Sequence, residues 1–184
     1  MVTIPRPPAA PLPSIASTYV PRTRWARPEP AVGPDQPIAG RPIPRLSITV
    51  ATDGSGEPDQ GGYGRGGYGW VSSIGGQGSG PASESSFGAE LRAIAKALEA
   101  HALYERITVF CDCKEALQAI RMYQSGERRN AWVKRGADAE MAYIDAFMSE
   151  RTVVFVRVKG HSGDPLNERA DRLARQARKA AAQR

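Results

Sequence analysis

The stretch VATDGSGEPDQGGYGRGGYGW, residues 50–70, begins as a strand, reaches an acid at Asp53 and then turns to glycine. Just before it, Leu46, Ile48 and Val50 alternate with smaller or polar residues. This is the periodicity of a strand with one buried face. A carboxylate at the end of a buried strand is costly to desolvate unless a partner compensates for the loss of water. The pattern therefore predicts a partner for Asp53, and a bound cation is one candidate.

The composition is mildly basic and poor in cysteine. The 184 residues include 25 Lys and Arg against 19 Asp and Glu, a net charge of +6, which suits a polyanionic partner.

The two cysteines, Cys111 and Cys113, flank an acid in an expected strand and offer no disulfide framework. We expect both to be small buried residues, since a zinc site would need a second pair. No apolar run approaches membrane-spanning length. We therefore expect a cytoplasmic monomer with no membrane partner.

Residues 1–45 differ in composition from the rest of the chain. They hold 12 of the 15 prolines, six arginines and only two acids. This composition predicts a disordered tail over 1–45, followed by one domain over 46–184. Two alternatives remain for the tail: a basic arm that helps to hold nucleic acid, or an organelle transit peptide, which the prolines oppose.

Beyond residue 45, apolar periodicity predicts an alternation of strands and helices. The alternation favours a mixed sheet covered by helices. The expected strands lie at 46–53, 68–74, loosely 82–86, 107–112 and 152–160, and the expected helices at 87–98, 116–122, 137–148 and from Pro165 onward, with Asp164 as the cap of the last.

Four acids recur at positions where they can meet. Asp53 and Asp112 each end an apolar strand, and the carboxyl ends of parallel neighbours lie at one edge of a sheet. Glu90 is expected in the first turn of its helix, where it could simply favour the helix N-terminus. Asp171 lies one turn after Asn167 and could be a solvated charge. The recurrence of strand-end acids before KGHSGDPLNERAD (159–171) favours a shared site instead.

These motifs together resemble a known family. TDGS (52–55), GGYG, AEL (89–91), FCD (110–112) and VKGHSGDPLNERADRLA (158–174) occur in the order of type 1 ribonuclease H, and the resemblance runs from about residue 46 to 178. The last motif is the most specific, because an Asn follows the His by six positions and an Asp follows it by ten. The resemblance implies an α/β, ribonuclease H-like fold with a five-stranded mixed sheet flanked by helices.

The resemblance also implies an activity, a metal and site residues. The activity would be endonucleolytic cleavage of the RNA strand of an RNA–DNA hybrid, and the cofactor two Mg²⁺ ions, with Mn²⁺ as a substitute. Two divalent ions can clamp the attacking and leaving oxygens, and carboxylates suit Mg²⁺ because it is a hard cation. The products would carry 3′-hydroxyl and 5′-phosphate ends. The metal-binding and catalytic residues become Asp53, Glu90, Asp112 and Asp171, with His161 as the mobile-loop histidine that moves a proton or assists product release.

The sequence indicates the residues that would contact the substrate less clearly than it indicates the metal-binding acids. Family members usually carry an Asn-containing segment before the helical glutamate, but here that segment is SSFGA (85–89). The basic segment GERRNAWVKRG (126–136) either contacts the phosphate backbone or is a solvated connector. The expected substrate-binding residues are Gly54, Ser55, Ser86, Asn167, Arg128, Arg129 and Trp132.

Two other functions remain as alternatives. One is a nuclease of the same superfamily that acts on structured DNA or double-stranded RNA. The other is a nucleic-acid-binding module that keeps the fold without the chemistry. All four acids are present, which argues against the second. His101, at an expected helix end, is interpreted as a surface residue.

Overall fold

The structure, a computed structural model, describes residues 46–56, 66–82, 85–126 and 137–183. The expected tail over 1–45 and the segment with Arg128, Arg129 and Trp132 lie outside these residues. The elements of the described part are β1 (Ser47–Ser55), β2 (Gly66–Ser72), β3 (Gln77–Ala82), α1 (Ser86–Ala100), β4 (Arg106–Cys111), α2 (Lys114–Gln124), α4 (Asp138–Glu150), β5 (Thr152–Arg157) and α5 (Pro165–Ala182).

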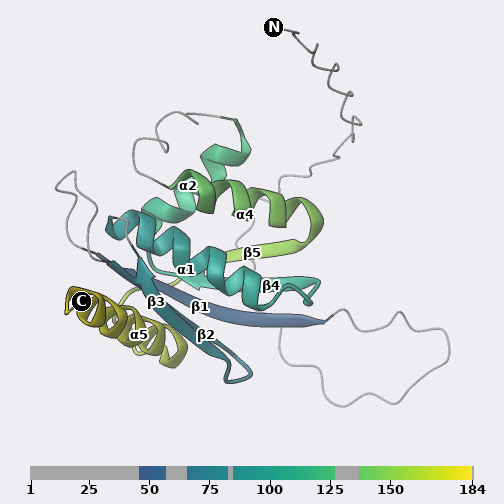
Figure 1. The fold of residues 1–184 in the computed structure, drawn as a ribbon. Coiled ribbons are helices and arrows are strands. Elements are labelled where there is room, and N and C mark those ends of the chain that lie inside the picture. Colours follow the sequence, from purple (N-terminus) through teal and green to yellow (C-terminus); the bar gives the residue numbers. More distant parts are fainter. Residues whose placement is uncertain (1–45, 57–65, 83–84, 127–136, 184) are drawn as a thin grey trace, which may run out of the picture. The chain divides into compact units, whose positions relative to one another are not determined.

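The strands form one mixed sheet in the order β3-β2-β1-β4-β5 (Figure 1). β1 is central: it runs antiparallel to β2 and parallel to β4. β3 adds to β2 in antiparallel fashion, and β5 adds to β4 in parallel. Helices α1, α2 and α4 cover one face of the sheet and α5 covers the other (Figure 1). This arrangement confirms the expected five-stranded mixed sheet flanked by helices.

The central strand β1 is buried on both faces, whereas its alternation predicted one buried face. Val50 belongs to the main core with α1, α2 and α4, and its neighbour Ala51 belongs to a second cluster under α5. The small side chain of Ala51 lets α5 approach the sheet. Thr52 and Asp53 continue the buried run. The strand also extends beyond Asp53 to Ser55, so the acid lies inside β1 and not at its end.

Two glycines of β2 allow α5 to pack directly on the sheet. A Cβ on Gly67 would lie 2.3 Å from the backbone nitrogen of Arg178, and one on Gly69 would lie 2.5 Å from the carbonyl oxygen of Ala170. A side chain at either position would therefore clash with helix backbone, which cannot yield as a flexible side chain can. Because Gly69 pairs with Asp53 across the sheet, this close packing fixes α5 beside the strand that carries the acid.

The helix starts follow the sequence closely. Asp164 caps α5, where its carboxylate oxygen accepts hydrogen bonds from the backbone of Leu166 (3.0 Å) and Asn167 (2.9 Å), and Pro165 opens the helix. Ser85 caps α1, where its hydroxyl accepts from the Gly88 backbone at 3.4 Å. Since α1 begins at Ser86, Glu90 is its fifth residue and lies just beyond the first turn, where it was expected.

Two further expectations are wrong. The third strand is β3, Gln77–Ala82, and not 82–86, because backbone pairing to β2 holds a segment with no large apolar residue. His101 is 5% exposed. Its Nδ1 lies 2.7 Å from the carbonyl oxygen of Ala97, and its ring packs edge-on against Trp70 at 5.1 Å. The position three residues after Leu98 continues the buried stripe of α1, which explains the burial.

The cysteines occupy two different environments, and neither forms a disulfide. Cys111 is fully buried in the main core, as expected. Cys113 is partly exposed and caps α2, where its sulfur accepts a hydrogen bond from the Ala116 backbone at 3.4 Å. Across the described ranges, none of the helices has the length and apolar character needed to span a membrane.

Candidate active site

Three of the four predicted acids meet at one edge of the sheet. Asp53 extends from β1, Asp112 directly follows β4, and Glu90 extends from α1. One carboxylate oxygen from each lies within 4.8 Å of the other two. The parallel pairing of β1 with β4 reaches Ala51 opposite Phe110, so Asp53 and Asp112 lie at the same level two residues further on. The sheet topology therefore brings these strand acids together, as their positions predicted.

The backbone of Gly54 holds Glu90 in place. A Cβ on Gly54 would lie 2.2 Å from the backbone nitrogen of Glu90, so α1 touches the end of β1 where only glycine fits. A hydrogen bond from the Gly54 backbone also favours the charged form of the Glu90 carboxyl. Gly54 was predicted to bind substrate; in this geometry its contact is with the helix that carries Glu90.

The crowded acids resist ionisation. Burial, followed by the charges of Asp112 and Asp171, raises the pKa of Asp53 to about 7, while the charge of Arg175 acts in the opposite direction. Burial, followed by the charges of Asp53 and Asp112, raises the pKa of Glu90 well above its usual range. Without a compensating cation, the carboxyls of Asp53 and Glu90 therefore hold their protons more strongly than ordinary carboxyls do.

The donor set fits a hard divalent cation. All three groups offer oxygen, and the buried Oε2 of Glu90 has no hydrogen-bond partner among the described residues. A buried oxygen without a partner is costly, and a cation would satisfy it. Gly160 packs so closely that a Cβ there would lie 2.7 Å from Oδ2 of Asp112, so the backbone of the β5–α5 loop lies directly beside that carboxylate. Oxygen donors without sulfur or imidazole favour Mg²⁺ or Mn²⁺ over Zn²⁺.

Asp171 stands apart from this group of three. Its carboxylate forms an ion pair with Arg175, one turn further along α5. The charge of Asp171 nevertheless raises the pKa of both Asp53 and Glu90, so it acts on the same site. The structure thus brings oxygens of three predicted ligands within 4.8 Å of one another and places the fourth ligand, Asp171, in an ion pair with an arginine.

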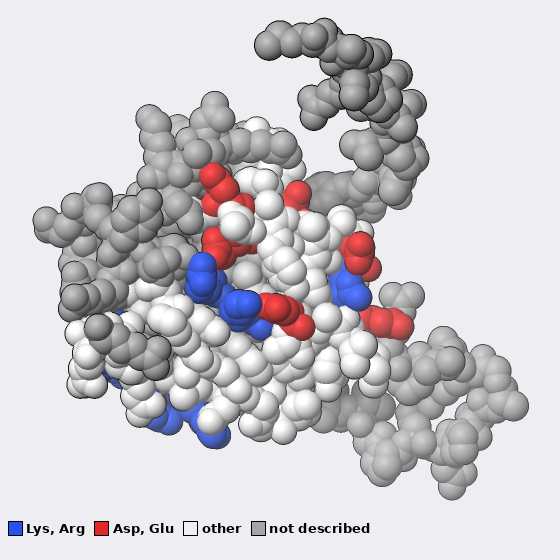
Figure 2. Space-filling model, in the orientation of Figure 1, with Lys and Arg blue, Asp and Glu red and all other residues white. Residues whose placement is uncertain are grey.

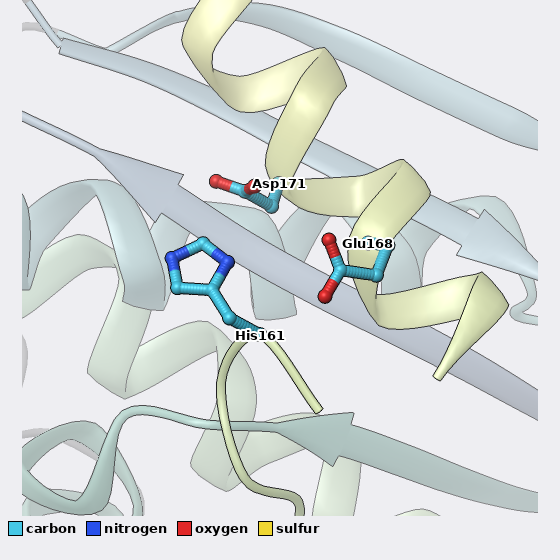
Figure 3. Close-up of side chains that lie close together, drawn as sticks. All are labelled: His161, Glu168 and Asp171. Carbon is cyan, nitrogen blue, oxygen red and sulfur yellow. The ribbon is translucent and has the colours of Figure 1, made fainter. Parts of the chain in front are cut away.

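His161 and Glu168 accompany Asp171. The three side chains lie within 4.8 Å of one another, with the imidazole beside both carboxylates (Figure 3). His161 is exposed on the β5–α5 loop and adopts a left-handed backbone conformation with φ of 52°, and Gly163 follows with φ of 85°. These two residues turn the chain from β5 into α5 and present the imidazole next to Asp171.

The remaining predicted contact residues have varied surroundings. Ser86 is exposed at the start of α1, and Ser55 is partly buried at the end of β1. The side chain of Asn167 is 2% exposed, and its buried Oδ1 has no partner in the described part of the chain. Sequence reasoning missed Arg175 and Glu168; the spacing of four positions from Asp171 to Arg175 is the signal that predicts an ion pair.

Charges of both signs alternate on the face that α1 and α4 cover (Figure 2). Basic and acidic side chains lie beside one another there and form the ion pairs Arg92–Glu140, Lys96–Glu99 and Arg151–Glu150. The described residues of this face therefore do not form a continuous basic surface of the kind that holds a polyanion.

The raised pKa of Asp53 predicts how stability depends on pH in chelator. The folded protein binds this proton up to about pH 7, whereas the unfolded chain releases it near pH 4, so the stability of the folded state falls as pH rises between these values. The decline amounts to at most about 4 kcal/mol. The Asn side chain of Asp53→Asn cannot titrate. The difference in melting temperature between this variant and the wild type, measured by thermal melts, should therefore increase in favour of the variant from pH 5 to pH 8.

The matched control is Asp145→Asn on α4, which removes the same formal charge. Its melting temperature should keep a nearly constant offset from the wild type across this range. An offset for Asp53→Asn that does not change with pH would contradict the crowded-carboxylate geometry.

Comparisons with known proteins agree with this geometry. Residues 45–179 match the model of the family described as RNase H. The chain is 33% identical to a ribonuclease H of Bradyrhizobium diazoefficiens over 141 residues, which cover 70% of this chain and 87% of that protein. It is also 33% identical to a ribonuclease H of Rhodospirillum rubrum over 147 residues, which cover 74% of this chain and 86% of that protein.

Solved structures support the fold. A foamy viral protease-reverse transcriptase in complex with dsDNA superimposes with a TM-score of 0.58 at 20% identity, over 76% of this chain and 99% of that one. The same kind of protein in complex with an RNA/DNA hybrid gives a TM-score of 0.59 at 18% identity, over 82% of this chain and 22% of that one. At this identity the likeness concerns the fold alone. The match over residues 45–179 and the two bacterial relatives show that the chain belongs to the RNase H family of endonucleases.

Proposed function

We propose that this protein is a Mg²⁺-dependent endoribonuclease that hydrolyses the RNA strand of RNA–DNA hybrids with two divalent cations. The observation that carries the proposal is the cluster of Asp53, Glu90 and Asp112 at the carboxyl edge of parallel strands, where the buried Oε2 of Glu90 has no hydrogen-bond partner among the described residues. Ligand sites of open α/β sheets lie at this edge. Family membership supports the same reaction.

Each acid has a distinct place in the proposed site. Glu90 and Asp112 would hold one cation together with Asp53. Asp53 is also coupled electrostatically to Asp171, so Asp53 would be shared between the two cations and Asp171 would serve the second. When bound, two divalent cations activate water as a nucleophile and stabilise the leaving oxygen. The four carboxylates position them and supply the negative charge that retains them.

His161 would handle a proton next to the second cation. Its imidazole is exposed and lies beside the carboxylate of Asp171 (Figure 3). A histidine exchanges protons near neutral pH, which suits protonation of the leaving group or assistance to product release. The loop carries the glycines Gly160 and Gly163 on either side of His161, so the ring can move with the substrate.

Recognition of ribose would use small polar groups near Asp53. Ser55 follows Asp53 by two positions and therefore lies on the same face of β1. Ser86 is exposed at the start of α1, where its backbone packs against Gly56 at the end of β1. Of these two serines, Ser86 lies in the segment SSFGA (85–89), where family members carry an Asn-containing segment. The proposed phosphate contacts from Arg128, Arg129 and Trp132 lie outside the described residues.

A cleavage assay tests the proposal. The purified protein, with Mg²⁺ or with chelator, is incubated with a labelled RNA–DNA hybrid, double-stranded RNA and double-stranded DNA. We expect Mg²⁺-dependent cleavage of the RNA in the hybrid, with 3′-hydroxyl and 5′-phosphate ends, because the nucleophile is water and not the 2′-hydroxyl. Products with 2′,3′-cyclic phosphate would refute this mechanism, and preferential cleavage of either duplex control would support another nuclease of the superfamily.

Substitution of His161 separates its role from that of the metal ligands. His161→Ala should slow single-turnover cleavage by about 10²–10⁴-fold, the usual contribution of a positioned proton-transfer group. Asp53→Asn should abolish cleavage under the same conditions. Ser162→Ala is the control in the same loop and should retain the wild-type rate. Equal losses in the His161 and Asp53 variants would show that the histidine has a more central role than proton transfer.

A further inference from the structure

Asp171 is already paired within the protein. Nη2 of Arg175 donates a hydrogen bond to Oδ2 of Asp171 across one turn of α5. The carboxylate side chain is 14% exposed and the guanidinium side chain 50% exposed. In this ion pair, the Asp171 side chain is therefore mostly covered by the protein, whereas half of the Arg175 side chain is exposed to water. A guanidinium stays charged at all working pH values, so a change of pH does not release Asp171 by deprotonating its partner.

The charge of Arg175 also reaches the neighbouring acids. It lowers the pKa of Asp53, against the effects of burial and of Asp112 and Asp171. Glu168 and His161 lie on another side of Asp171, within 4.8 Å. In the absence of a metal, Arg175 thus places a positive charge near Asp171 on α5 and near Asp53 on β1.

We propose that Arg175 is an internal counter-ion that competes with the second divalent cation for Asp171, and that it thereby sets the cation concentration at which the site fills. The proposal rests on the two-cation function proposed above. A cation at Asp171 meets the positive guanidinium at close range, so the ion pair must open or the cation must bind against repulsion. Because half of the Arg175 side chain is exposed, it can turn into solvent at little cost.

The competition predicts a modest effect. Ion pairs between side chains four positions apart on an exposed helix face contribute about 0.3–1 kcal/mol. Removal of Arg175 should therefore tighten binding at the weaker cation site by about 2- to 5-fold. The cation affinity of the stronger site, which Asp53, Glu90 and Asp112 form, should change less.

The test is cation binding to the full chain without nucleic acid. Mn²⁺ and Mg²⁺ affinities are measured by calorimetry for the wild type, Arg175→Gln and the control Arg172→Gln. Arg172 is exposed on the same helix, but it is rotated by about 100° from Asp171. Its substitution removes the same formal charge without the ion pair. We expect tighter binding in Arg175→Gln than in Arg172→Gln, and equal affinities in the two variants would overturn the proposal.

A thermodynamic cycle isolates the contact. In an Asp171→Asn background, Arg175→Gln should no longer change cation affinity beyond the effect of Arg172→Gln, because the shared ligand is gone. If Arg175→Gln changes the cation affinity as much in that background as in the wild type, the change comes from the charge of Arg175 alone and not from its contact with Asp171. That result would refute the competition. Arg175→Lys, which keeps the charge and loses the forked donor, should fall between Arg175→Gln and the wild type.

Cleavage measured against Mg²⁺ concentration distinguishes two kinds of failure. If the wild type neither binds cations nor cleaves the hybrid, the proposed function is wrong. If the wild type does both while Arg175→Gln and Arg172→Gln bind cations alike, the proposed function stands and only the role of Arg175 is refuted.

Discussion

The repulsion among carboxylates that are crowded at one edge of a sheet is the constraint on which this structure depends. Asp53, Glu90 and Asp112 place oxygens within 4.8 Å of one another, and burial is the leading reason why the pKa of Asp53 rises to about 7. Such an arrangement opposes folding unless a cation or a proton compensates. The fold contributes the rigidity that keeps the acids together: β1 is covered on both faces, and neither α1 nor α5 can move away without opening a core.

Glycine allows the close packing behind that rigidity, twice against helix backbone and once against a carboxylate. Gly54 admits the backbone of Glu90, Gly69 admits α5 opposite Asp53, and Gly160 packs against the carboxylate of Asp112. In each case a Cβ would lie within 3 Å of another group. The glycine-rich sequence after the first strand thus serves partly to bring α1 and α5 against β1 and β2, a role distinct from the expected approach of nucleic acid.

The sequence predicted the sheet, the helices and the meeting of the strand acids, because these follow from periodicity, from caps such as Asp164 and from the geometry of parallel strands. It did not predict β3, since Gln77–Ala82 has no apolar alternation and is held by pairing to β2. It also misplaced His101, which continues the buried stripe of α1 and packs against Trp70 from a distant strand. The Asp171–Arg175 ion pair was overlooked because Asp171 was considered only as a metal ligand or a solvated charge, although the spacing of four residues predicts the contact.

The most direct test of the central claim is a pair of thermal melts at neutral pH, with chelator and with Mg²⁺, for the wild type and Asp53→Asn. If the carboxylates repel one another, the variant should be more stable than the wild type in chelator, by about 1–2 kcal/mol at an effective dielectric near 20 or about 2–8 °C. Mg²⁺ should then raise the melting temperature of the wild type more than that of the variant, because the variant lacks a ligand. A variant that is less stable in chelator, with an equal Mg²⁺ increment, would contradict this account and would show that Asp53 is a structural anchor.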